Sequence, residues 1–137
     1  MNTWLMKSEP DVYGWQKLVE DGKGRWDGVR NPRAANNLRN MQVGDRCFFY
    51  HSNIGKEIVG VMEVTKTAYP APTDTTGRWV AVDVKPVMPI KRPVTLAEIK
   101  ADPKYAEFQL VKYSRLSVMP VSPEHWKSIC KTAGIPA

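Results

Sequence analysis

The sequence predicts an α+β domain whose five or six strands form a strongly curved sheet or barrel, with helices at its edges and between strands. Two observations predict this class: short apolar or alternating runs with the composition of strands, and short segments with helical spacing of apolar residues between them. The chain has 137 residues, of which 42% are hydrophobic, so we expect a single domain over residues 1–137 with a core of its own.

The first two elements are a strand and a helix. Residues 3–6 form a short apolar run that predicts a buried strand, and Pro10 breaks it because proline cannot donate to a central ladder. Asp11 can cap a helix over about residues 12–20. We expect its apolar face to contain Val12, Trp15, Leu18 and Val19.

A second helix and two strands follow. Asn31 before Pro32 has the pattern of an N-cap followed by proline at the first helical position, and it predicts a helix over residues 32–41. Residues 46–50 and 57–66 read as strands because they are rich in apolar, β-branched and aromatic side chains.

The second half of the chain begins with a loop at 70–77 that is rich in Pro, Thr and Gly. Side chains in residues 78–85 alternate between a valine face and a mixed face, which predicts a half-buried strand. Thr95 with Glu98 matches a capping box, which predicts a short helix. The other expected elements are a continuation of the strand at 87–90, a short helix at 103–110, a strand at 117–121 and a terminal helix from 122 to about 132.

Charge favours an anionic partner. Lys and Arg number 20 against 14 Asp and Glu, a net charge of +6, which suits nucleic acid. We find no signal peptide and no apolar run near the ~18 residues of a membrane helix, so we expect a cytoplasmic or nucleoid-associated protein with no membrane partner. Cys47 and Cys130 are expected to be reduced thiols, and neither they nor His51 and His125 have metal-ligand spacing. We therefore expect no metal and no cofactor.

One segment indicates a pocket for a flat ring. Trp26 precedes the turn pair Asp27-Gly28, and Arg30 and Asn31 follow it. A Trp beside a turn can stack a nucleobase, while Arg and Asn supply donors and acceptors for its edge. The alternatives are a core Trp and a helix cap, and for Asn31 the cap is the stronger reading.

A second segment, Phe48 to Asn53, is an apolar strand that ends in aromatic and hydrogen-bonding side chains. In the binding hypothesis Tyr50 stacks or donates its hydroxyl and Ser52 bonds a base edge. Side chains alternate along a strand, so Tyr50 and Ser52 share one face while His51 and Asn53 share the other. Both pairs can reach one pocket only if the strand bulges or ends there.

Eight segments match one family pattern in order along nearly the whole chain: 4–10, 26–31, 36–39, 44–53, 58–64, 68–70, 79–84 and 115–121. On these segments the chain resembles EVE-domain proteins of the PUA-like superfamily. The resemblance implies a PUA-like pseudobarrel of mainly antiparallel strands, related to the SRA and YTH domains that hold a flipped modified base. The loop at 70–77 is shorter than the family pattern implies.

The resemblance also implies base-contacting roles for residues that the pattern alone leaves open between binding and ordinary structure. The expected base-binding set is Ser8, Glu9, Trp26, Arg30, Asn31, Tyr50, His51, Ser52, Asn53, Trp79, Arg115, Leu116 and Ser117. The expected phosphate-binding set is Lys7, Arg33 and Arg39.

Two function classes follow. The first is a binding module that holds a modified cytosine or adenine of DNA or RNA and acts through an effector protein. The second resembles the ASCH group: a small amidohydrolase for acylated nucleosides, with Lys7, Glu9 and either Ser52 or Thr65 as base and nucleophile. No Ser-His-Asp or Cys-His constellation is legible, so the binding module is favoured. A third possibility, an interaction protein that binds a small metabolite, stays open.

Overall fold

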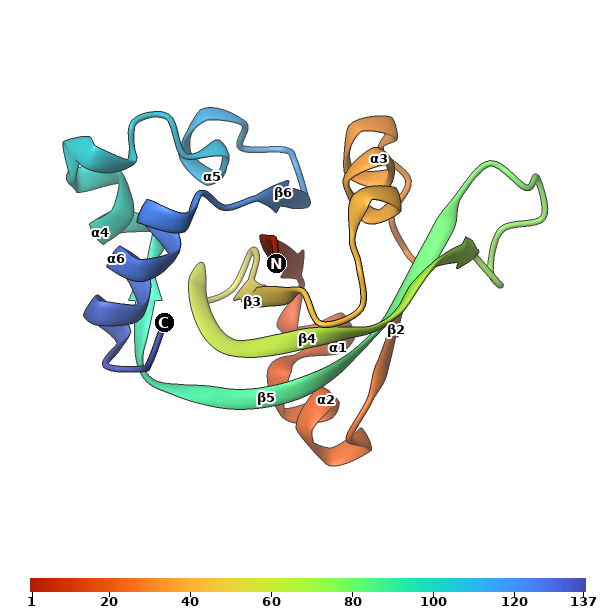
Figure 1. Cartoon of the computed structure of the whole chain (residues 1–137), viewed down its shortest axis with the longest axis horizontal. Helices are drawn as coiled ribbons and strands as arrows, with labels where there is room; N and C mark the ends of the chain where they lie inside the picture. The colour runs from red at the N-terminus through yellow and green to blue at the C-terminus, as the bar shows by residue number, and fades with distance from the viewer.

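The computed structural model describes residues 1–137 and consists of one six-stranded mixed sheet with short helices at its edges (Figure 1). The strands are β1 Thr3–Ser8, β2 Gly24–Trp26, β3 Arg46–His51, β4 Glu57–Pro70, β5 Val80–Thr95 and β6 Val118–Pro120. The helices are α1 Pro10–Tyr13, α2 Trp15–Asp21, α3 Pro32–Asn40, α4 Leu96–Ala101, the 3-10 turn η1 Pro103–Tyr105, α5 Gln109–Lys112 and α6 Pro123–Ala133.

The strand order is β2-β5-β4-β3-β1-β6, and the sheet curls into a half-barrel. Neighbouring strands are antiparallel except β1 and β3, which run parallel with Leu5 opposite Phe48. The curvature comes from the two longest strands, because the register between β4 and β5 shifts at four places. The expected curved α+β sheet is therefore confirmed.

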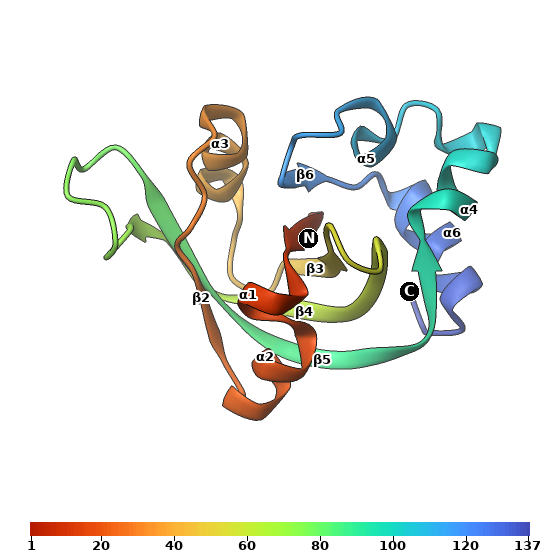
Figure 2. The ribbon, with the colours of Figure 1, turned by 180° about the vertical axis from the view of Figure 1, so that it is seen from behind.

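Helices gather at both ends of this sheet. In Figures 1 and 2, α4, α5 and α6 lie together at one end, and α3 lies at the other, beside the β4–β5 connection. Figure 2 shows α1 and α2 next to β2 and β5. No helix is long and apolar enough to cross a membrane.

The core follows the predicted apolar pattern. Trp4, Trp15 and Trp126 are buried, as expected, and the ring of Trp126 stacks on Phe48 at 3.8 Å between centroids. The indole Nε1 of Trp4 donates to the one buried carboxylate, Asp45, over 3.0 Å, so that this polar pair is satisfied. Cys47 and Cys130 are buried, unpaired thiols.

The helix expected over 12–20 is instead two helices. Gly14 separates α1 from α2 in an extended conformation (φ −93°, ψ 170°). Trp15 and Leu18 are buried as expected, but Val12 is 75% exposed and Val19 42% exposed. The break at Gly14 changes the helical phase, so Val12 leaves the face that Trp15 and Leu18 share.

Two further elements differ from expectation. The sequence predicts no strand at 24–26; the three-residue strand β2 forms because Trp26 pairs with Val82 on β5, a contact distant in sequence. The helix expected at 103–110 is a 3-10 turn followed by α5. Both segments are too short for periodicity to identify them.

The strand at 78–85 begins two residues later than expected, at Val80, but continues past Pro86 as predicted. Pro86 and Pro89 lie where the β4–β5 register shifts, beside Met62 and Gly60 respectively. Proline is tolerated in this strand because an irregular ladder does not require a donor at every position.

Candidate functional site

A pocket of about 360 Å³ lies between the end of β1, α1 and the connection after β2. This volume falls in the range of about 300–1,000 Å³ typical of small-ligand sites. It is lined by Lys7, Ser8, Glu9, Val12, Tyr13, Arg25, Trp26, Asp27, Gly28, Val29, Arg30 and Ser117. Six of these residues belong to the set expected from the sequence: Lys7, Ser8, Glu9, Trp26, Arg30 and Ser117.

Trp26 is both a pocket wall and a member of the core. Only 8% of its surface is exposed, and its ring makes perpendicular contacts with Phe49 at 5.4 Å and with Tyr13 at 6.4 Å. Perpendicular aromatic contacts of this kind hold a ring in one orientation. Trp26 is therefore a core residue that also lines the pocket, and its stacking on a base stays a prediction.

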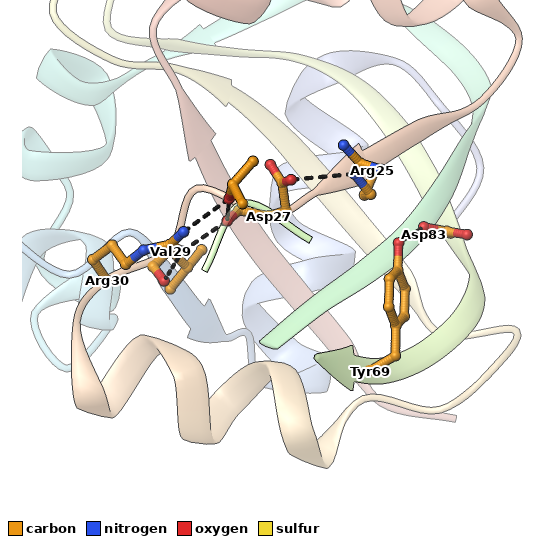
Figure 3. Close-up of polar contacts among 7 residues, drawn as sticks. Arg25, Asp27, Val29, Arg30, Tyr69 and Asp83 are labelled. Atoms are coloured by element: carbon orange, nitrogen blue, oxygen red, sulfur yellow. Dashed lines mark hydrogen bonds and ion pairs between the residues drawn. The ribbon is translucent and has the colours of Figure 1, made fainter. Parts of the chain in front are cut away.

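Arg30 holds the connection that follows β2, in which residues 27–31 contain no turn or bend, so the turn expected at Asp27-Gly28 does not form. Its Nη1 donates to the carbonyl oxygens of Asp27 (2.7 Å) and Val29 (3.0 Å), as Figure 3 shows. Its Nη2 donates to Thr73 Oγ1 at 2.8 Å, in the β4–β5 connection. Arg30 therefore holds the connection after β2 in place and also lines the pocket.

The Asp27 carboxylate takes no hydrogen bond in this wall and has Arg25 as its ion-pair partner. Its Oδ2 is buried and takes no hydrogen bond, although Arg25 Nε lies 3.2 Å away as an ion-pair partner (Figure 3). An ionised carboxylate offers about four acceptor positions. Sequence reasoning treated Asp27 only as a turn residue, although its place between Trp26 and Gly28 in the matched segment was a usable signal.

Tyr13, also missed from the sequence, stands opposite Trp26. Its hydroxyl is buried without a hydrogen-bond partner and faces Gly24, where an added Cβ would come within 2.7 Å of it. Burial, together with the charge of Asp21, raises the pKa of the Tyr13 hydroxyl. Tyr13 therefore stays neutral and contributes its ring to the pocket wall.

Three polar residues at the end of β1 and at α1 complete the wall. Lys7 Nζ donates to the Ser114 carbonyl oxygen (3.0 Å), and burial lowers the pKa of this amine. Ser8 Oγ donates to the Tyr13 carbonyl oxygen at 2.6 Å. Glu9 Oε1 accepts from Asn53 Nδ2 at 2.7 Å. Each of these side chains is therefore oriented by a bond within the protein.

Behind this wall lies the second segment singled out in the sequence. The register between β3 and β4 does shift between Phe49 and Tyr50, but Tyr50, His51, Ser52 and Asn53 do not line the pocket. Tyr50 is buried, which raises its pKa to about 12. Their contribution to base binding stays a prediction.

The remaining expected residues also lie outside the pocket lining. Asn31 Oδ1 accepts from the Ala34 N–H at 3.0 Å and so caps α3, as predicted. Arg33 lies over the Tyr113 ring at 4.2 Å, and Leu116 is buried. The others outside the lining are Arg39, Trp79 and Arg115.

Behind β2, the hydroxyl of Tyr69 on β4 hydrogen-bonds to Asp83 on β5 (Figure 3). Burial, and then the hydrogen bond to Asp83, raise the pKa of Tyr69 to about 12. This hydrogen bond links β4 to β5 next to Arg25, because the Cα of Arg25 on β2 is paired with that of Asp83.

A curved mixed sheet of six strands, with a polar-walled pocket at the open end of β1, defines a PUA-like α+β domain. The EVE domain family model matches residues 2–132, and the chain belongs to this family. It is 35% identical to thymocyte nuclear protein 1 of Mus musculus, an alignment that covers 93% of this chain and 72% of the mouse protein.

Solved structures agree with this assignment. A protein of Rhodopseudomonas palustris is 51% identical, with a TM-score of 0.92 and coverage of 98% of this chain and 94% of that one. Human THYN1, solved in complex with DNA containing 5-methylcytosine, is 30% identical with a TM-score of 0.87 and full coverage of both chains. The YTH domain of Zygosaccharomyces rouxii MRB1, solved with N6-methyladenosine RNA, shares the fold at 18% identity and a TM-score of 0.60, covering 96% of this chain and 86% of that one.

Proposed function

We propose that this chain is a nucleic-acid-binding module that holds a modified cytosine of DNA, turned out of the duplex, in the pocket beside Trp26. The observation that carries the proposal is the Asp27 carboxylate, which lines a pocket of ligand size and takes no hydrogen bond beside its ion pair with Arg25. The complex of human THYN1 with DNA containing 5-methylcytosine supports the choice of base.

Asp27 gives the pocket a chemical preference. Cytosine presents its N4 amine as a donor, and a carboxylate is the usual acceptor for that amine. Thymine carries the same 5-methyl group but presents a carbonyl oxygen at that position, which a carboxylate repels. The apolar side chains of Val12, Trp26 and Val29 are available to the ring and its methyl group.

Affinity for the polymer comes from the basic surface. The net charge of +6 attracts phosphate, and Lys7 places a cation at the pocket rim. Arg33 and Arg39 on α3 are the proposed phosphate contacts. Because turning out a base costs a few kcal/mol, contacts to the base and to the phosphates must together offset that cost. A module of this kind needs an effector protein as its partner.

The test is fluorescence anisotropy with matched DNA and RNA oligonucleotides that carry cytosine, 5-methylcytosine, 5-hydroxymethylcytosine, thymine, adenine or N6-methyladenine at one position. We expect 5-methylcytosine DNA to bind best, and its advantage to persist when salt is raised. Equal, steeply salt-dependent binding to all oligonucleotides would show phosphate attraction alone and contradict the proposal.

Two matched variants test the role of Asp27. In Asp27→Asn we expect the ratio of the affinities for 5-methylcytosine and thymine oligonucleotides to fall at least about tenfold, because an amide replaces the charged acceptor. Glu20→Gln, at an exposed position on α2, removes the same charge and should leave the preference unchanged. If both variants show the same preference, Asp27 does not contact the base.

The amidohydrolase alternative has one observation in its favour. Lys7 lines the pocket with a pKa lowered by burial, which is the property a general base needs. Glu9 also lines the pocket, whereas Ser52 and Thr65 do not. Steady release of acetate from N4-acetylcytidine would favour this function, and stoichiometric binding without release would favour the binding module.

A further inference from the structure

The end of β3 and the loop that follows it are hydrogen-bonded to the segment that forms one wall of the pocket. Three hydrogen bonds join residues 51–53 to the segment from Ser8 to Trp15, which carries four of the lining residues. Ser52 N–H donates to the Ser8 carbonyl oxygen (2.9 Å), Asn53 Nδ2 donates to Glu9 Oε1 (2.7 Å), and the Trp15 N–H donates to His51 Nε2 (3.0 Å). The wall is therefore positioned by a loop that itself lies outside the pocket lining.

The His51 bond replaces a helix cap. The N-cap residue of α2 is Gly14, which has no side chain to accept the free N–H groups of the first turn. His51, 36 residues further along the chain, accepts one of them. A ring nitrogen accepts a hydrogen bond only when it is unprotonated, so this contact requires neutral His51 with its proton on Nδ1.

The surroundings of His51 favour the neutral form. The Phe49 ring meets it edge-on at 5.6 Å, Gly14 lies against Nε2, and Glu57 on β4 is its cross-strand partner. Burial lowers the pKa of His51, and the charge of Glu57 opposes this in part. Glu57 is the charged group that acts on the ring.

A chain of aromatic contacts connects this position to the pocket. Trp15 packs on Phe49 at 5.6 Å, and Phe49 packs on Trp26 at 5.4 Å. Trp15 also lies so close to Gly60 that an added Cβ there would come within 2.5 Å of its ring. The start of α2 therefore has little room to shift without moving Trp26 or the segment that carries Val12 and Tyr13.

We propose that neutral His51 is a positioning residue for the base pocket: by capping α2 it holds the wall in its binding geometry, and its protonation weakens base reading. The proposal rests on the proposed function, because it concerns the preference for the modified base. The neutral form prevails at high pH, so the preference is complete above the ordinary histidine pKa of about 6.5 and is lost as the pH falls through the lower pKa of the folded protein.

The chain contains only two histidines, which allows a matched control. The quantity to measure is the ratio of affinities for duplexes with 5-methylcytosine and with cytosine, from pH 7.5 to pH 5.0, because general charge effects cancel in it. We expect at least about a twofold fall in the wild-type protein. His51→Gln keeps an acceptor oxygen without a titration in this range, so its ratio should stay flat. His125→Gln, on α6, should behave as the wild type does.

A second measurement on the wild-type protein does not depend on how well the variant folds. By linkage, the His51 ring followed by NMR should titrate at lower pH with the methylated duplex bound than with the unmodified duplex bound, and the Trp15 amide shift should follow the same curve. Equal His51 titrations, or the same pH dependence in His51→Gln as in the wild type, would overturn the positioning role and leave the proposed function intact. Absence of any preference at pH 7.5 would overturn both.

Discussion

Arg30 Nη2 donates to Thr73 Oγ1 at 2.8 Å, and this bond joins the segment after β2 to the connection between β4 and β5. The same hydroxyl lies 3.3 Å from the Asp27 carbonyl oxygen, to which it donates. Thr73 is therefore the point where the β4–β5 connection supports the loop that carries Asp27.

Replacing Thr73 should loosen this support without changing volume. Thr73→Val removes the hydroxyl and both its bonds, and should lower the free energy of unfolding by about 0.5–1.5 kcal/mol, measured by urea denaturation. Thr75→Val, at an exposed position in the same connection, serves as the control and should have little effect. If the two variants are equally stable, the Thr73 bonds do not contribute.

Trp26 is expected to contribute to both stability and binding. Trp26→Ala should destabilise the fold by about 3–5 kcal/mol, because it removes a buried ring, and should weaken binding of 5-methylcytosine DNA more than tenfold. Trp26→Phe keeps an aromatic surface and should bind more tightly than the alanine variant. Anisotropy well below the melting temperature separates the two effects, and unchanged binding in folded Trp26→Ala would rule out a stacking role.

Gly60 is expected to tolerate no side chain. An alanine Cβ would lie 2.5 Å from the Trp15 ring, so Gly60→Ala should destabilise the protein by about 1–3 kcal/mol. Gly28 has nothing within 4 Å of an added Cβ, and Gly28→Ala is the matched control for urea denaturation. Equal stability of the two variants would mean that Trp15 can move aside, which would also weaken the argument for His51.

Asn31 provides a simpler test of a local interaction. Asn31→Ala removes the cap of α3 and should cost about 1 kcal/mol of stability. Asn40→Ala, at the exposed end of the same helix, should cost less. Measuring 5-methylcytosine DNA binding in Asn31→Ala then tests the predicted contact of Asn31 with the base, since a cap alone would leave the affinity nearly unchanged.

The elements that the sequence predicts well are those whose signals are local. The capping box of Thr95 and Glu98, the Asn31 cap and the apolar run of β3 depend on neighbouring residues, and all are present. The strand β2 depends instead on a partner in β5 far along the chain, and three residues carry no period of their own. Local patterns could not identify it.

The candidate site divides in the same way. The residue types of the segment from Trp26 to Arg30 indicated a pocket, and Trp26 and Arg30 do line it, but the turn predicted at Asp27-Gly28 does not form. The segment after β3 reads equally well as a binding edge, yet the pairing of β3 with β1 places it behind the wall. Strand order decides whether a polar cluster at a strand end lines the pocket. Strand order itself is set by contacts between residues far apart in the sequence, which no short motif encodes.

The position of β1 in the sheet has a consequence for biosynthesis. This strand precedes the other five along the chain but lies between β3 and β6, with Leu5 paired to Phe48 on one side and to Met119 on the other. Its ladder therefore stays incomplete until β6, Val118–Pro120, has been translated. Contacts so distant in sequence slow folding, because loop closure must precede them. Lys7 and Ser117 both line the pocket, and the Lys7 N–H donates to the Ser117 carbonyl oxygen at 2.8 Å, so the lining of the pocket is complete only after β6 has paired with β1.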